Sequence, residues 1–489
     1  MDLREMIKMV ERLTIKKHHL FGILLVIFLS VLSTIITNEF VNSFTSRVTT
    51  YFLIGILGLL AFGPILHRIA KHSFDLAEPG IWFALYYFTH FGMRAIYDLI
   101  FGSPVLGFEP ESVNFGLVNA ALGVSIFGLL AFWVGYYTPL GKAFANSFGM
   151  LPRKWNQSRA LQIAILCTAF GWSFRIFLIF YQAGGIGNWL AANKYVELAQ
   201  TQGTTYLSIL SSVATVGLLI YFILARVFRK CTYWFLFSMF LVPELTFRFV
   251  SGSRAQFIFL LLGLLICLYM TSKRDYKTTM RYSFGVAILI ILFIFLYPLF
   301  SIIRGGIRDS EEILLRTSNF WENPVKIFYL IGSRQVGLDS LALIIDYISK
   351  GEPYTLGSEL KLAAISWISR KIWLDKPIIS LGKIFYEKFY PPIFHEGTSV
   401  AVTLPGEFYW AFGFVGVIIG MLIIGVLWRF LFEYLVCHKE NLSNILVVSF
   451  MFPSFFILME QTLVSLLTVH LPQFIIAMIV SFILHRRIT

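Results

Sequence analysis

The chain has 489 residues, of which 57% are hydrophobic and only 14% are charged, and its formal net charge is +13. So large an apolar fraction excludes an ordinary soluble globular protein, which could not bury that much apolar surface. The positive charge does not indicate nucleic-acid binding either, because the basic residues are spread over the connections between apolar runs instead of forming one polar domain. The composition therefore predicts an all-α integral membrane protein.

Apolar runs long enough to cross a bilayer of roughly 30 Å recur along the whole chain. The first run follows a basic start and shows no small-residue cleavage site, so we expect it to stay in the protein as a membrane helix. We predict about twelve transmembrane helices. They lie near residues 20–37, 51–67, 80–102, 114–137, 160–181, 206–225, 233–250, 255–271, 283–303, 406–434, 444–464 and 467–484.

Lysine and arginine are concentrated in alternate connections between these runs. The second connection contains Arg68 and Lys71, and the sixth contains Arg226, Arg229 and Lys230. The short connections of the other set are nearly free of basic residues. Because basic loops stay on the cytoplasmic side, this alternation predicts that both termini are cytoplasmic.

One connection is far longer than the others and runs over residues 304–405 on the predicted outer side. It contains the amphipathic pieces "DSLALIIDYISK" and "LAAISWISRKIWLDKP". Helices of this kind often lie on the membrane surface, and long ordered insertions tend to carry function. We therefore divide the chain into membrane helices 1–9 (residues 1–303), the large outer loop (304–405) and membrane helices 10–12 (406–489).

Ionisable residues inside the apolar runs are costly in a membrane and are by default candidates for a functional site. His90, Arg94 and Asp98 follow one another at steps of four, so a regular helix places them on one face. For Arg94 and Asp98 we favour an internal ion pair that orients helices. The "GVIIG" of the tenth predicted helix is interpreted as a helix-packing spacing, with Gly416 and Gly420 on one face.

Arginines also gather at the predicted outer ends of several helices, which is the side opposite to the usual positive bias. A single arginine at such a place can simply extend to the interface, and Arg248 can pair with Glu244. As a set they favour a cationic pocket, because the planar guanidinium holds its charge and matches phosphate oxygens. The residues are Arg175, Arg248, Arg254, Arg304 and Arg308.

Three stretches in the second half occur in the order found in one membrane family. They are "SGSRAQFIFLLLGLLI", "SWISRKIWLDKP" in the outer loop and "TLPGEFYWAFGFVGVIIG" at the tenth helix. Together they resemble the Wzy-type O-antigen and capsular oligosaccharide repeat-unit polymerases. The resemblance implies a GT-C-like polymerase or ligase architecture. It matches Arg254, Arg370, Lys376 and Glu407 to the family's motifs, although Ser369 stands where the family usually has proline.

Membership in this family would imply a metal-independent membrane glycosyltransferase that needs no cofactor. Its substrate would be an oligosaccharide on undecaprenyl pyrophosphate, in the inner membrane of a bacterium, with the active site on the periplasmic or extracellular side. The resemblance also implies a chain-length regulator and a flippase of the same pathway as partners. It does not imply binding to nucleic acid. Glu407 and His395 are the candidate general bases, and Arg334 in the loop joins the arginines and Lys376 as a candidate substrate-binding residue.

Two other classes of protein remain open at this point. An O-antigen ligase would use the same lipid-linked donor and differ only in its acceptor. A flippase or secondary carrier would place its charges near the membrane midplane and often show repeated halves, whereas the charges here are biased outward and no repeat is apparent. The sequence also lacks HExxH and clustered Cys/His motifs, so it does not indicate a tightly held metal.

Overall fold

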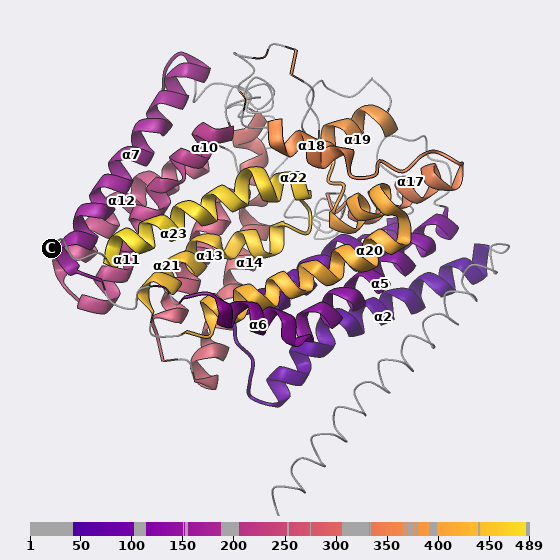
Figure 1. The fold of residues 1–489 in the computed structure, drawn as a ribbon, viewed down its shortest axis with the longest axis horizontal. Helices are drawn as coiled ribbons and strands as arrows, with labels where there is room; N and C mark the ends of the chain where they lie inside the picture. The colour runs from indigo at the N-terminus through magenta and orange to yellow at the C-terminus, as the bar shows by residue number, and fades with distance from the viewer. Residues whose placement is uncertain are drawn as a thin grey trace, which may run out of the picture.

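The computed structural model describes residues 43–101, 114–149, 151, 155–186, 205–251, 254–273, 275–305, 332, 334–365, 368, 373, 375–376, 380–390, 399–438 and 441–485. Throughout these residues the regular secondary structure is helical (Figure 1). Long runs of apolar side chains explain this, because a helix satisfies all its backbone hydrogen bonds within one segment.

The helices follow the predicted spans closely. The part before the large loop forms α2 (Ser43–Ala70), α3 (Pro79–Phe88), the π-helical turn η1 (Thr89–Met93), α4 (Arg94–Phe101), α5 (Phe115–Tyr137), α6 (Pro139–Ser147), α7 (Gln157–Ala183), α10 (Thr205–Ser211), α11 (Val213–Phe228), α12 (Cys231–Val250), α13 (Arg254–Met270) and α14 (Tyr276–Gly305). The remainder forms α17 (Gly337–Ser349), α18 (Ser358–Ile365), α19 (Leu381–Phe389), α20 (Leu404–Leu431), the π-helical turn η3 (Phe432–Val436), α21 (Leu442–Ile457), α22 (Leu463–Ser465), the π-helical turn η4 (Leu466–His470) and α23 (Leu471–His485).

Seven helices in the described part of the chain are long and apolar enough to cross a membrane. They are Ser46–Ala70, Phe115–Tyr137, Gln157–Tyr181, Tyr206–Phe228, Cys231–Val250, Leu404–Val436 and Leu463–Leu484. Two shorter apolar helices, Ala255–Met270 and Leu442–Phe455, also fall on predicted spans. The prediction of a multi-pass, all-helical membrane protein is confirmed. The first predicted span lies outside the described residues, and the count of about twelve crossings, the orientation and the GT-C-like architecture stay predictions.

The closest packing between long helices joins α5 and α20. A Cβ atom added at Gly425 of α20 would collide with the backbone of Phe132 in α5, and one added at Gly135 of α5 would collide with the backbone of Leu422. Glycine at both positions lets the two backbones touch, which is how helices associate without a hydrophobic driving force between them.

The glycines of "GVIIG" serve a different contact from the one predicted. Helix α20 is interrupted at Phe412 and Gly413, where Gly413 has φ 65° and ψ −154°. The turn brings Phe408 back over the rest of the helix, so that a Cβ at Gly416 would lie 2.5 Å from the Phe408 carbonyl oxygen and one at Gly420 would lie 2.5 Å from the Phe408 ring. The expectation of close packing is right. The partner, however, is the first segment of the same helix, because the left-handed Gly413 reverses the chain locally.

The described parts of the large loop are packed onto the helix bundle. Helix α17 lies against α5 and α20, and its Leu341 and Ile344 are fully buried. Phe385 of α19 and Trp410 of α20 pack edge to face, with ring centroids 5.9 Å apart, in a small apolar core of the loop that is separate from the core of the helix bundle. The prediction that "DSLALIIDYISK" lies on the membrane surface is therefore wrong, since its apolar face is covered by protein. Figure 1 shows α17, α18 and α19 grouped beside the start of α20.

Candidate functional site

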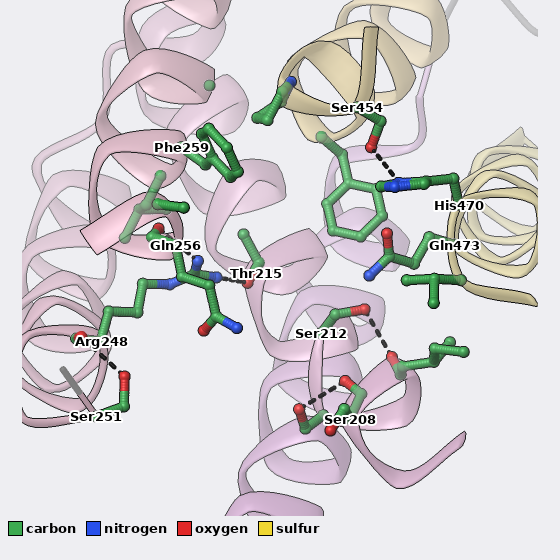
Figure 2. Close-up of a pocket in the computed structure, with 18 of the residues that line it drawn as sticks. Ser208, Ser212, Thr215, Arg248, Ser251, Gln256, Phe259, Ser454, His470 and Gln473 are labelled. Atoms are coloured by element: carbon green, nitrogen blue, oxygen red, sulfur yellow. Dashed lines mark hydrogen bonds between the residues drawn. The ribbon is translucent and has the colours of Figure 1, made fainter. Parts of the chain in front are cut away.

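A cavity of about 560 Å³ opens among the ends of several helices (Figure 2). Its described lining comes from the last turns of α7, α12 and α21 and from the first turns of α11 and α13, together with α10, η4 and the start of α23. Because α7, α12 and α21 end there while α11 and α13 begin there, the cavity lies at one end of the bundle. The large loop belongs to the same end, since the Leu404 backbone N–H at the start of α20 donates to the Met459 carbonyl beyond α21, at 3.1 Å.

Two of the predicted arginines meet at one wall of this cavity, on either side of a shared carboxylate. Arg175 of α7 forms a two-pronged ion pair with Glu244 of α12, with Nη2 donating to Oε1 at 2.9 Å and Nη1 donating to Oε2. Arg248, one turn after Glu244, donates from Nε to the same Oε1 at 2.9 Å. The predicted pairing of Arg248 with Glu244 is confirmed, and Arg175 joins it.

Neighbouring groups hold this arginine cluster (Arg175, Glu244 and Arg248) in a defined arrangement. Arg248 donates to the Thr215 hydroxyl at 2.6 Å and to the Gln256 carbonyl at 2.7 Å. The guanidinium of Arg175 lies over the Phe247 ring, 4.8 Å from its centroid. Arg175 and Glu244 are almost fully buried, at 2% and 1% exposed. Two guanidiniums against one carboxylate leave a net positive charge on groups whose orientation is fixed.

The described cavity lining contains both guanidiniums but no carboxylate, because Glu244 sits behind them. Serine and threonine hydroxyls and the side chains of Gln256, Gln461 and Gln473 supply most of its other polar atoms, while Phe259 and Leu260 contribute apolar surface. Such a mixture of a few oriented polar groups with apolar walls is typical of a ligand site. The charge of the lining favours an anionic ligand.

The other predicted cationic residues are distributed differently. Arg254 begins α13, and its neighbours Ala255 and Gln256 line the cavity. Arg304 lies near the end of α14, and the side chains of Arg254 and Arg304 are outside the described residues.

The predicted cations of the large loop do not line the cavity in the described part of the chain. Lys376 is buried, and its Nζ donates to the Ile368 carbonyl at 2.5 Å, away from the cavity lining. Arg334 is exposed and does not line the cavity either. Arg308, Arg370 and His395 lie outside the described residues.

Glu407, the other candidate base, lies in the first turn of α20 and is buried. Its Oε2 accepts a hydrogen bond from the Leu463 backbone N–H at 2.7 Å. It does not line the cavity, but it anchors the connection between α21 and α22, and that connection carries the cavity residue Gln461. The carboxylate is therefore placed to orient one wall of the cavity.

Sequence reasoning missed His470, which lines the same cavity. It is buried, with Nδ1 2.8 Å from the Ser454 hydroxyl oxygen and Nε2 3.0 Å from the Gln461 amide oxygen. The signal was available, because His470 is an ionisable residue within the apolar run 467–484 and such residues are functional candidates by default.

A second buried charge cluster joins α4 to the loop helix α17. Arg94 pairs with Asp98, Nε to Oδ1 at 3.2 Å, and with Asp339, Nη2 to Oδ2 at 2.9 Å. The predicted Arg94–Asp98 ion pair is confirmed. The π-helical turn η1 precedes Arg94, so the steps of four from His90 do not keep a regular helical phase. Burial raises the pKa of the Asp339 carboxyl to about 6, against the lowering effect of Arg94. This cluster ties the loop to the bundle.

The fold and the cavity define a multi-pass membrane protein with a buried, net-positive site at one end of its helix bundle. Over residues 19–489 the chain matches the family model of the O-antigen polysaccharide polymerase Wzy. The chain therefore belongs to the Wzy family, which assigns it to polysaccharide polymerisation in a membrane. No curated protein and no solved structure matches the chain significantly.

Proposed function

We propose that the chain polymerises oligosaccharide repeat units carried on undecaprenyl pyrophosphate, and that the cavity at the arginine cluster holds the pyrophosphate of the donor. The observation that carries the proposal is the pair of guanidiniums at one cavity wall, the buried Arg175 and the partly buried Arg248, which together outweigh the charge of Glu244. Buried guanidiniums fixed by protein partners bind phosphate oxygens without having to reorganise.

The reaction transfers the growing glycan from its lipid to the next lipid-linked unit. An acceptor hydroxyl forms a bond to the anomeric carbon of the donor sugar, and the bond from that carbon to the pyrophosphate oxygen breaks. Negative charge then develops on the leaving pyrophosphate. Arg175 and Arg248 stabilise this charge in the transition state, and Arg254 adds to them, because α13 starts at the cavity.

We assign Arg304, Arg308, Arg334 and Arg370 to binding the lipid-linked substrate as it approaches this end of the bundle. Lys376, which was predicted with them, is buried and holds the Ile368 carbonyl instead. The site faces the periplasmic or extracellular side of the inner membrane, which agrees with the basic residues on the opposite connections. Apolar lining residues such as Phe259 and Ile457 suit the first isoprene units of the lipid. Glu407 positions the α21–α22 connection, and His395 stays a candidate base.

Arginine substitutions test the pyrophosphate site. Arg248→Ala leaves Arg175 and Glu244 with no net charge, so chain extension should fall about a hundredfold or more. Arg254→Ala should also shorten the polymer. Arg281→Ala, at an exposed position near the start of α14, is the matched control and should leave chain length unchanged. Chain length is measured on polysaccharide gels at equal amounts of membrane-inserted protein.

Two further readouts separate the alternatives. Adding Glu244→Gln to Arg248→Ala restores one net positive charge, so a partial recovery of activity would identify charge as the requirement. Wild-type chain length in both Arg248→Ala and Arg254→Ala would overturn the pyrophosphate site. The product distinguishes the functions, because a ladder of repeat numbers indicates a polymerase, a single transfer to one acceptor indicates a ligase, and movement of lipid-linked units without bond formation indicates a flippase.

A further inference from the structure

Three side chains on the wall formed by α21, its following connection and η4 are joined by hydrogen bonds. Ser454 Oγ lies 2.8 Å from His470 Nδ1, and His470 Nε2 lies 3.0 Å from Gln461 Oε1. All three residues line the cavity. Figure 2 shows His470 and Ser454 on the side of the cavity opposite Arg248.

The local backbone departs from a regular α-helix at both ends of this contact. His470 is the last residue of the π-helical turn η4, which widens the helix by one residue and so changes the direction of the side chains that follow. Ser454 follows Pro453 inside α21, and proline leaves the carbonyl one turn earlier without its helical donor. A Cβ added at Gly263 of α13 would lie 2.6 Å from that carbonyl, on Ser449, so α13 approaches closely here. These irregularities aim Ser454 and His470 at one another.

The partners of the ring determine which nitrogen carries the proton. The Gln461 amide oxygen can only accept, so Nε2 carries the proton and donates to it. Nδ1 is then the basic nitrogen, and it accepts from the Ser454 hydroxyl. A proton-accepting imidazole oriented by a third group is the arrangement that activates a hydroxyl in many enzymes.

We infer that His470, in place of His395, is the general base of the transfer and that Ser454 relays the proton to it; this inference rests on the proposed polymerase function. The acceptor hydroxyl gives its proton to Ser454 Oγ, while the Ser454 proton passes to His470 Nδ1. The acceptor oxygen forms the new bond to the anomeric carbon, and the electron pair of the broken bond leaves on the pyrophosphate. The imidazolium keeps its hydrogen bond to Gln461 and afterwards returns the proton to the released pyrophosphate or to water.

The position of the two groups supports a single displacement. The base faces the cavity from η4 and α21, while the arginines that take up the leaving charge face it from α7 and α12. An attacking hydroxyl and a leaving group on opposite sides of one carbon give inversion. The new linkage should therefore have the opposite anomeric configuration from the lipid-linked donor.

The test uses the purified full chain in lipid vesicles and lipid-linked repeat units extracted from cells that lack the polymerase. His470→Ala should lower the turnover of chain extension by about a hundred- to ten-thousand-fold. Added imidazole should restore part of this activity in His470→Ala and change nothing in the wild type. Ser454→Ala should lose less, and the double variant should be no worse than His470→Ala, because both residues serve one proton path. His67→Gln, at an exposed position in α2, is the matched control and should behave as wild type.

The outcomes of these measurements separate the role of His470 from the polymerase function itself. Wild-type turnover in His470→Ala, or a loss that imidazole does not relieve at an unchanged melting temperature, would overturn the role of His470 as base. A covalent glycan on Ser454, detected by mass spectrometry, would overturn the relay and make Ser454 a nucleophile. If the wild type forms no ladder of repeat numbers and Arg248→Ala gives the same products as the wild type, the proposed polymerase function is contradicted. The assignment of His470 as base is then contradicted as well. A loss in Arg248→Ala together with full activity in His470→Ala contradicts the base assignment alone.

Discussion

At the scale of single residues, two clusters of buried charge in the described part of the chain hold each ionised side chain against a group of opposite charge. Glu244 is held between Arg175 and Arg248, and Arg94 is held between Asp98 and Asp339. Removing one member of a buried pair is far more costly than removing an exposed one, because the remaining charge is left without water and without a partner. The arginine cluster keeps one positive charge in excess, which suits the anionic ligand proposed for the cavity.

Glu244→Gln should therefore destabilise the protein strongly, because it leaves the guanidiniums of Arg175 and Arg248 without the carboxylate that pairs with both. We expect a loss of about 3 kcal/mol or more in the free energy of unfolding. The exposed pair of Lys350 and Asp346, with 2.6 Å between Nζ and Oδ2, provides the control. Asp346→Asn should cost less than about 1 kcal/mol. Melting temperatures in detergent would compare the two, and equal shifts would contradict the assigned role of Glu244.

The stability contributed by Asp339 should depend on pH. Burial raises the pKa of this carboxyl from its ordinary value to about 6 in the folded protein, so the folded state holds the proton more tightly than the unfolded state. The contribution of Asp339 to the free energy of unfolding is therefore most favourable at low pH, and it is lost as the pH rises toward 6. The melting temperature of the wild type, taken relative to that of Asp339→Asn, should fall between about pH 4 and pH 6. Above about pH 6 the difference between the two proteins should stay constant. A difference that does not vary with pH would refute this.

At the scale of elements, glycines and helix irregularities position the site more than helix propensity does. Gly413 reverses α20, while η4 and Pro453 direct His470 and Ser454 toward the cavity. Gly135 and Gly425 allow α5 and α20 to touch along their backbones. At each of these places the backbone or side chain makes a contact that a regular helix with larger side chains could not make, and the contact depends on one particular neighbouring residue.

Gly425→Ala should separate α5 from α20, because the added methyl group has no room beside the Phe132 backbone. We expect a loss of about 1–3 kcal/mol in stability, as in other overpacked interiors. Gly123→Ala in α5 is the matched control, since nothing lies within 4 Å of the added carbon. That change should be neutral or stabilising by up to about 1 kcal/mol, because alanine favours a helix. Thermal unfolding of both variants would test the contact, and a stable Gly425→Ala protein would argue against it.

At the scale of the whole molecule, the cavity and the large loop belong to the same end of the bundle. The loop helix α17 is tied to α4 by Asp339 and packs on α5 and α20, while Glu407 ties the start of α20 to the α21–α22 connection. This end of the bundle is therefore one assembly of helix ends and loop, and the proposed reaction requires it to face the compartment that holds the lipid-linked units.

The orientation can be tested with a cysteine-free protein that carries one new cysteine at a time. Lys350→Cys, exposed after α17, should react with a membrane-impermeant maleimide added to intact cells or spheroplasts. Lys142→Cys, exposed in α6 between α5 and α7, should react only after the membrane is opened. The reverse pattern would place the cavity on the cytoplasmic side and contradict the proposed reaction side.

The linear pattern of residues is sufficient for the class of protein, the location of the helices and the gathering of arginines near helix ends. These features follow from apolar run length and from the high cost of a charge in lipid, both of which are local properties of the chain. The Arg94–Asp98 and Glu244–Arg248 pairs are also local, since each spans one helical turn.

The contacts that build the cavity join residues far apart in the chain, and no sequence spacing encodes them. Arg175 reaches Glu244 across α7 and α12, and Glu407 holds Leu463 instead of facing the cavity. Ser454 meets His470 where Pro453 interrupts α21 and the π-helical turn η4 interrupts the last helix, and Gln461 reaches His470 from the connection between α21 and α22. The helices could be located from hydropathy because burial in lipid depends on composition. The hydrogen bonds that join Ser454, His470 and Gln461 required the folded chain, because a hydrogen bond depends on the relative position of two backbones.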